Sequence, residues 1–289
     1  MPSLKDLKVR INSVKSTQKI TKAMKMVAAS KLRRAREAAE ASRPYAEAME
    51  KMLTRLAQGY VGQSNAPALL AGTGRDDRHL IIVVTSDRGL AGGLNSGIIR
   101  AARRRMRELQ AQGKTAMLYT VGRKGREGLN SEFREQIVGE KTEIAKKIVQ
   151  YTSADAVAQD VTDLIAREAI DVVGLYYSQF KSAISQVPTY QQLVPLVVEA
   201  PTAEVAPTEY EPDEEEILAD LLPKNLAMQI FKALLESAAS EQGARMNAME
   251  SATKNAGEMI KKLSLKYNRT RQANITKELI EIISGAEAL

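Results

Sequence analysis

The sequence predicts an α/β fold plus a coiled coil: a long antiparallel two-helix coiled coil from the N- and C-termini with an inserted Rossmann-like α/β domain. Two observations predict it. Both ends of the chain carry apolar residues at helical spacing over long stretches with few helix breakers. Between them, short apolar runs alternate with amphipathic stretches, the order that βαβ units produce.

The C-terminal helix is predicted from residues 224–284, which contain no proline and only two glycines, Gly243 and Gly257. Its apolar stripe consists of Phe231, Leu235, Ala238, Met249, Ala252, Ala256, Met259, Leu263 and Ala273. At about 1.5 Å per residue such a helix spans roughly 90 Å, and its stripe needs a partner to cover it.

The partner is predicted at the other end, where residues 3–43 lack glycine and proline. Heptad positions there are occupied by Leu4, Leu7, Ile11, Val14, Gln18, Thr21, Lys25, Ala28, Leu32, Ala35, Ala39 and Ser42. The polar break at Gln18, Thr21 and Lys25 coincides with a second apolar set, Ile20, Met24 and Val27, and is interpreted as the stripe drifting round the helix. The seven-residue repeat predicts a left-handed supercoil.

The middle of the chain predicts a small α/β domain. Strands are expected at 79–85, 115–121, 171–180 and 184–196, and helices at 95–112, 124–129 and 152–168. Pro188 and Pro195 place the last strand at an edge of the sheet. The predicted organisation is a helix at 1–57, a linker at 58–77, an α/β foot at 78–200, a linker at 201–212 and a helix at 213–289. A kink is expected at Pro44, and a kink or a restart of the helix at Pro223.

Composition excludes several classes of protein. The 289 residues include no cysteine, which excludes disulfides and thiol chemistry, and no apolar run approaches the ~20 residues of a membrane span. The net charge of +7 is uneven: residues 1–57 hold 14 Lys and Arg against 5 Asp and Glu, and residues 243–277 hold 8 against 2. The long helices are therefore expected to meet an acidic partner, whereas the bland interpretation is a solvated basic face.

No group of residues predicts catalysis. The glycines at 89, 92, 93 and 97 match neither dinucleotide nor P-loop spacing, so a tight strand-to-helix turn explains them. His79 is the sole histidine and is expected at the start of a strand. The acidic run 213–216 suits the first turn of a helix. Neither cofactor nor metal is predicted.

Four motifs carry a resemblance to a known family. STQKITKAMKMVAASK at 16–31 resembles the N-terminal helix of the gamma subunit of F-type ATP synthase, bacterial type, and SDRGLAGGLN at 86–95 resembles a loop of that family. SEQGARMNAM at 240–249 and RQANITKELIEIISGA at 271–286 resemble its C-terminal helix. The resemblance covers the whole chain in order.

The resemblance implies a non-catalytic rotor shaft, held by alpha and beta subunits at the head and by epsilon and the c-subunit ring at the foot. Its location would be the cytoplasmic face of the bacterial inner membrane, where it is peripheral. Implied contacts with beta are Lys19, Lys22, Lys25, Lys31, Arg33, Arg34, Arg271 and Gln272. Implied contacts with the c ring are Glu209, Tyr210, Glu211 and Asp213.

Two other classes remain open from the residues alone. A basic, heptad-patterned coiled coil could bind nucleic acid or an acidic membrane surface, although nucleic acid is not among the partners that the resemblance implies. A nucleotide-binding enzyme is the third class, and binding of ATP to the isolated chain would distinguish it.

Overall fold

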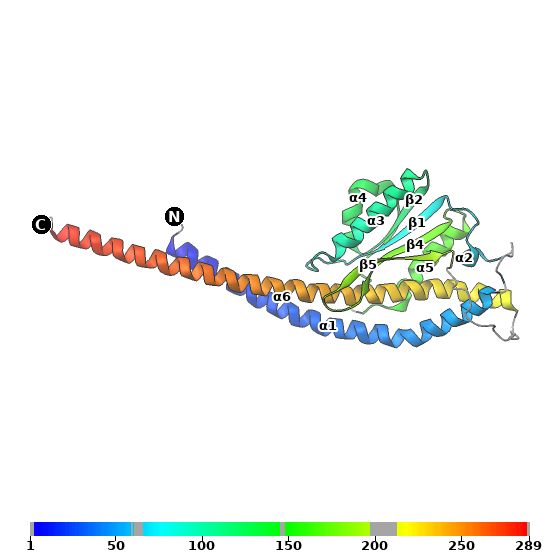
Figure 1. Ribbon diagram of the computed structural model, residues 1–289, viewed down its shortest axis with the longest axis horizontal. Helices are drawn as coiled ribbons and strands as arrows, with labels where there is room; N and C mark the ends of the chain where they lie inside the picture. The colour runs from blue at the N-terminus through cyan, green and yellow to red at the C-terminus, as the bar shows by residue number, and fades with distance from the viewer. Residues whose placement is uncertain (1–2, 59, 61–65, 145–147, 197–212, 288–289) are drawn as a thin grey trace. The chain divides into compact units, whose positions relative to one another are not determined.

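A computed structural model describes residues 3–58, 60, 66–144, 148–196 and 213–287 (Figure 1). Its two long helices come from the two ends of the chain: α1 is Leu4–Gln58 and α6 is Glu214–Glu287. The chain divides into two compact units, one of Met1–Ala28 with Arg245–Leu289 and the other of Ala29–Ala244. Both long helices therefore contribute residues to each unit.

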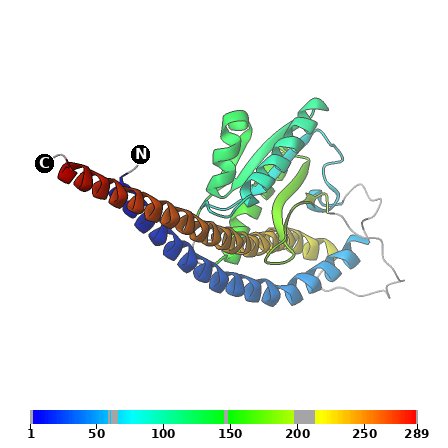
Figure 2. The ribbon, with the colours of Figure 1, turned by 60° about the vertical axis from the view of Figure 1, so that its left-hand side comes forward.

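In the helical unit, α1 and α6 pair in opposite directions, which confirms the predicted antiparallel pairing (Figure 2). The hydroxyls of Thr21 and Thr253 lie 2.7 Å apart, and Lys25 Nζ lies 2.7 Å from Glu250 Oε1, so one helix descends in number as the other ascends. Leu7 is 1% exposed in this seam. The left-handed supercoil stays a prediction.

The predicted drift of the apolar stripe on α1 is wrong. Ile20 and Val27 are 59% and 57% exposed, whereas Thr21 is only 7% exposed. Thr21 stays in the seam because its hydroxyl bonds across to Thr253, and a buried polar group that is hydrogen-bonded costs little. The seam therefore follows the heptad positions, polar ones included.

Both long helices continue through their prolines. Pro44 lies inside α1 and Pro223 inside α6, so α6 does not restart at Pro223. Each proline removes one backbone hydrogen bond. Packing on both sides of Pro223 holds the helix together, since Leu218, Leu222 and Leu226 are all buried.

In the part of the chain that the structure describes, five strands form one sheet in the order β3-β2-β1-β4-β5. The strands are β1 Arg78–Val84, β2 Thr115–Val121, β3 Ile137–Lys141, β4 Val172–Phe180 and β5 Gln186–Val194. The first four are parallel, and β5 joins the edge antiparallel to β4, as its prolines predict. The sequence did not predict β3, in which three residues are half-buried and two are exposed.

Helices cover both faces of the sheet (Figure 1). On one face, α3 (Leu94–Ala111) and α4 (Arg123–Phe133) cover the side chains of Ile81 and Val83. On the other face, α5 (Tyr151–Ala166) and α6 cover Leu80 and Ile82. These four side chains alternate along β1, as in a strand buried on both sides. The shorter elements are α2 (Ala68–Ala71) and a 3₁₀ turn, Arg134–Gln136.

The predicted segment boundaries remain an interpretation. The expected linker at 58–77 contains α2, and the expected linker at 201–212 lies outside the described residues. The compact units divide α1 between Ala28 and Ala29, and divide α6 between Ala244 and Arg245.

An ion pair between the buried Asp171 and the partly exposed Arg78 closes the amino end of the sheet. Asp171 is 1% exposed and accepts hydrogen bonds from Arg78 Nε at 3.0 Å, Arg78 NH2 at 2.8 Å and Thr73 Oγ1 at 2.6 Å. These bonds, above all those from Arg78, hold the pKa of the Asp171 carboxyl well below its ordinary value. The pair joins the residue before β4 to the first residue of β1.

We expect Asp171→Asn to lower the free energy of unfolding by about 2 kcal/mol at pH 7, because the partly exposed Arg78 guanidinium loses a charged hydrogen-bond partner. The folded pKa lies below the unfolded value of about 3.9, so the carboxylate's contribution is complete above that value and is lost as pH falls below about 4. Denaturant unfolding at pH 7 and pH 3 measures both effects. Asp163→Asn, at an exposed position of α5, is the control, and equal stability of the two variants at pH 7 would refute the assignment.

Candidate functional site

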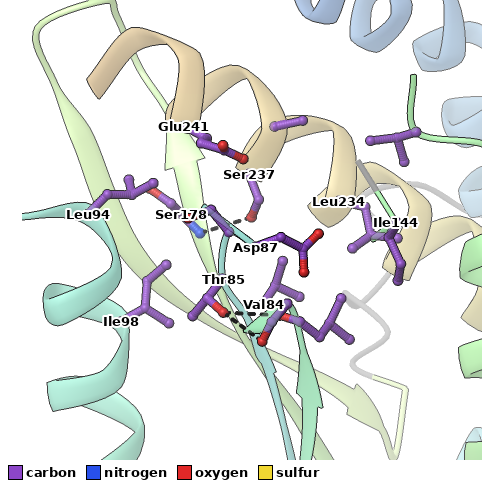
Figure 3. A pocket seen from close by; sticks show the side chains of 15 residues that line it. Val84, Thr85, Asp87, Leu94, Ile98, Ile144, Ser178, Leu234, Ser237 and Glu241 are labelled. Carbon is purple, nitrogen blue, oxygen red and sulfur yellow. Dashed lines mark hydrogen bonds between the residues drawn. The ribbon is translucent and has the colours of Figure 1, made fainter. Parts of the chain in front are cut away.

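The carboxyl ends of β1 and β4 meet where the strand order reverses, the position at which doubly wound folds bind ligands. Here α6 crosses that position, and its Leu234, Ser237 and Glu241 line a cavity together with Thr85 and Asp87 (Figure 3). The cavity measures about 30 Å³, enough for ordered water. Small-molecule pockets measure roughly 300 Å³ or more, so a nucleotide does not fit here.

The glycine-containing loop beside this cavity forms the tight turn that the sequence predicts. Leu90 and Gly92 have positive φ angles of 64° and 57°, a conformation that suits glycine. The turn is held by its own hydrogen bonds: Ser86 N donates to Asn95 Oδ1 at 3.0 Å, and Asn95 Nδ2 donates to Ser86 Oγ at 2.8 Å. The polar groups of Ser86 and Asn95 therefore serve the turn itself.

Two serines of α6 anchor the helix to β4. The pairing of β1 with β4 ends at Val83 and Tyr176, so the backbone of Ser178 extends beyond it. Ser178 N donates to Ser237 Oγ at 3.3 Å, and Ser240 Oγ donates to Ser178 O at 2.9 Å. Hydroxyls from a helix thus take the place of a neighbouring strand.

The helical unit carries an open groove of about 820 Å³ between α1 and α6. We call it the basic groove, and its lining residues are Gln18, Lys19, Lys22, Lys25, Met26, Glu250, Thr253, Lys254 and Gly257. Lys25 is paired with Glu250, and both side chains keep more than a third of their surface exposed. The groove is therefore a solvated, net positive surface that an acidic partner could contact.

The structure groups only some of the residues predicted to contact beta. Lys19, Lys22 and Lys25 line the basic groove, together with Lys254 from α6. Three further lysines of α6, Lys261, Lys262 and Lys266, lie further along the helix and do not line the groove, because the register sets Thr253 opposite Thr21.

The remaining predicted contacts fall elsewhere. Lys31, Arg33 and Arg34 are exposed on the α1 segment of the other unit, where Arg33 Nε bonds Glu37 at 2.8 Å. Arg271 and Gln272 are exposed near the end of α6. The predicted c-ring residues Glu209, Tyr210 and Glu211 lie outside the described residues, and Asp213 directly precedes α6.

An exposed apolar surface on the end of α6 was not predicted as functional. Its residues are 48–67% exposed and comprise Ile275, Leu279, Ile280, Ile282 and Ile283. The signal was present in the sequence, since apolar residues there point to several sides of the helix rather than to one stripe. Such a surface marks a place where another molecule packs.

Comparison with known proteins places these features in a family. The family model described as ATP synthase matches residues 3–289. The chain is 57% identical over 301 residues to the ATP synthase gamma chain of Rhodospirillum rubrum, and 57% identical over 290 residues to that of Paracoccus denitrificans, with 100% of each chain covered.

Solved structures of ATP synthases are also similar to this chain. One from the mitochondrial ATP synthase of Tetrahymena thermophila, described as central stalk and c-ring, is 33% identical with a TM-score of 0.62, over 81% of this chain and 99% of that one. A chain from the Euglena gracilis mitochondrial ATP synthase has a TM-score of 0.70 over 99% of this chain and 94% of its own, at 19% identity. At that identity the second likeness concerns the fold alone.

We expect Ser240→Ala to lower the free energy of unfolding by about 1–2 kcal/mol, because the buried carbonyl of Ser178 would lose its hydrogen-bond donor. Ser240 is 0% exposed, so water cannot replace the hydroxyl without rearrangement. Ser251→Ala, at an exposed position of the same helix, is the matched control. Denaturant unfolding of both variants measures the difference, and indistinguishable midpoints would contradict the anchoring role.

Proposed function

Because this chain belongs to the gamma chain family of ATP synthase, we propose that it is the central rotor shaft of an F-type ATP synthase. It transmits torque between a proton-driven ring of c subunits and the catalytic sites of an alpha/beta head, and it is not catalytic itself. The observation that carries the proposal is α6, one helix of 74 residues whose last turns expose apolar side chains that a surrounding partner would cover.

The helices suit the transmission of torque. At about 1.5 Å per residue, the 74 residues of α6 correspond to roughly 110 Å of helix. Since residues of α1 and α6 belong to both compact units, torque applied to either unit has a continuous hydrogen-bonded route into the other. The serine anchor ties α6 to β4, so rotation of the α/β unit turns the helix.

The basic residues are proposed to contact the beta subunits. Lys19, Lys22 and Lys25 would attract acidic side chains of beta, and Lys31, Arg33 and Arg34 would extend the positive surface along α1. Exposed ion pairs are worth about 0–1 kcal/mol each, which suits a sliding contact because no single pair holds the shaft at one angle.

At the end of the complex away from the alpha/beta head, the α/β unit is proposed to bind the other rotor subunits. Its partners there are epsilon and the c ring, with residues 209–213 contributing to the ring contact. The proposed place is the cytoplasmic face of a bacterial inner membrane. Among the described residues, every helix is too short or too polar to span a bilayer.

The function is tested by reconstitution. The full chain is mixed with alpha and beta subunits, and ATP hydrolysis is measured with and without it. We expect a stable complex whose hydrolysis depends on this chain, and little retention of the chain on DNA at physiological salt. Retention on DNA with no assembly would instead support the nucleic-acid-binding alternative.

Charge reversal tests the basic groove. We expect Lys19→Glu with Lys22→Glu and Lys254→Glu to lower coupled ATP synthesis about tenfold at low ionic strength, if three contacts of about 0.5 kcal/mol each are lost. The loss should shrink at high salt, because screening already weakens these contacts in the parent. Lys25 is left unchanged because it also pairs with Glu250.

The control for that variant changes the same charge outside the groove: Lys8→Glu, Lys15→Glu and Lys262→Glu, all at exposed positions. It should retain nearly full synthesis. Equal losses in both variants would show that overall charge, rather than the groove, matters.

The end of α6 gives a second prediction. Arg271 and Gln272 each offer several hydrogen-bond donors, and an arginine can grip a carboxylate through two parallel bonds. We expect Arg271→Ala with Gln272→Ala to lower the rate of coupled synthesis, since each lost bond is worth roughly 1–3 kcal/mol. Asn268→Ala with Arg269→Ala, also exposed on α6, is the control. Unchanged synthesis and assembly in the Arg271→Ala, Gln272→Ala variant would show that these two residues make no important contact with beta.

A further inference from the structure

Three consecutive seam positions of α1 in the helical unit are polar, and the third, Lys25, pairs with Glu250 at the surface. Heptad spacing from Leu4 and Leu7 leads to Gln18 and Thr21, positions that a coiled coil normally fills with apolar side chains. Thr21 is 7% exposed, and it faces Thr253 of α6. We call Gln18, Thr21 and Thr253 the polar layer.

The two threonine hydroxyls form a short chain of hydrogen bonds. Thr21 Oγ1 and Thr253 Oγ1 lie 2.7 Å apart, and each also has a carbonyl of its own helix in reach, Met249 O at 2.7 Å for Thr253 and Gln18 O at 3.1 Å for Thr21. Each hydroxyl has one hydrogen, so only one order is possible at a time. The shorter distances favour Thr21 donating to Thr253, which donates to Met249 O.

A glycine permits the third contact of the layer. Gln18 Nε2 donates to Thr253 O at 3.4 Å, and a Cβ added to Gly257 would lie 3.0 Å from that same nitrogen. Glycine in a helix interior costs about 1 kcal/mol relative to alanine. At this position the small residue gives the amide room to lie across α6.

The buried residues next to the polar layer are mostly small, whereas the larger Leu7 and Met249 lie further along the seam. The small residues include Ala28 and Ala256, and alanines pack nearly as well after a shift along the helix. The hydroxyl pair, by contrast, forms in one alignment only. A single buried polar layer is known to specify register in coiled coils.

We propose that the polar layer fixes the register of α1 against α6 and so positions the basic groove. The groove is lined from both helices, and Lys25 meets Glu250 one turn from Thr21. A shift in register would separate Lys254 from Lys19 and Lys22. Gln18, Thr21 and Thr253 are thus positioning residues, and the part of the proposal that concerns the groove's use rests on the proposed function.

The register is measured directly in the full chain. Since the chain has no cysteine, Ser16→Cys and Lys261→Cys provide two unique exposed sites for nitroxide labels, one on each helix. Double electron–electron resonance should give one narrow distance in the parent. In Thr21→Val with Thr253→Val we expect a second distance, because a change of register moves one label along the helix axis by about 5 Å, the rise of one helical turn.

Two control variants distinguish loss of the hydrogen bond between the two threonines from other effects of the substitutions. Thr21→Ser with Thr253→Ser keeps both hydroxyls and should keep the single distance. Thr17→Val with Thr276→Val makes the same chemical change on each helix, but these hydroxyls bond only Ser13 O and Gln272 O of their own helices, so the distance should stay single. A single narrow distance in Thr21→Val with Thr253→Val would overturn the proposal.

Coupled ATP synthesis then tells the two proposals apart. If the valine variant shifts the register and lowers synthesis while the serine variant restores both, the layer positions the groove. If the register shifts but neither the valine variant nor reversal of the groove lysines alters synthesis, the layer still sets the register, and the proposed contact of the groove with beta fails. Lowered synthesis with an unshifted register would count against the layer as a positioning device.

Discussion

The apolar stripe of α6 must be covered along its length, and different partners cover it in turn. Near its start, Leu218 and Leu222 pack with Leu53 and Leu56 of α1. Further on, residues 226–235 pack on the sheet. In the helical unit the seam partner is α1 again, and over the last turns no described residue covers the exposed isoleucines. Each stretch of α6 therefore has apolar side chains that suit the surface packed against it.

The need to cover the apolar stripe of α6 also explains the structure at the carboxyl end of the sheet. Doubly wound folds leave a crevice where the strand order reverses, and enzymes fill it with a ligand. Here a helix fills it, and the hydroxyls of Ser237 and Ser240 satisfy the backbone of Ser178 where β1 has ended. A fold widely used for chemistry serves in this chain as a fixing point for a helix.

Much of this arrangement could be predicted from particular residues. The long stretches with few glycines and prolines at the two ends of the chain predicted the helix pair. Pro188 predicted that β5 lies at the edge of the sheet. Hydropathy failed at Thr21, because periodicity records the polarity of a side chain and not the partner that satisfies it. Strand β3 was not predicted because none of its five residues is buried, so it lacks an apolar run. Individual lysines could be named in advance, but Lys254 joins Lys19 and Lys22 only through the register of two helices far apart in sequence.

The contact between Thr21 and Thr253 joins residues 232 positions apart, which has a consequence for biogenesis. A ribosome adding about 10 residues per second completes the first threonine roughly 20 s before the second. Throughout that interval α1 exists without the helix that covers it, and its apolar seam is open to other nascent chains and to chaperones. Its 14 lysines and arginines within residues 1–57 favour solubility during the wait. A chain released before its last helix is synthesised keeps the first one uncovered.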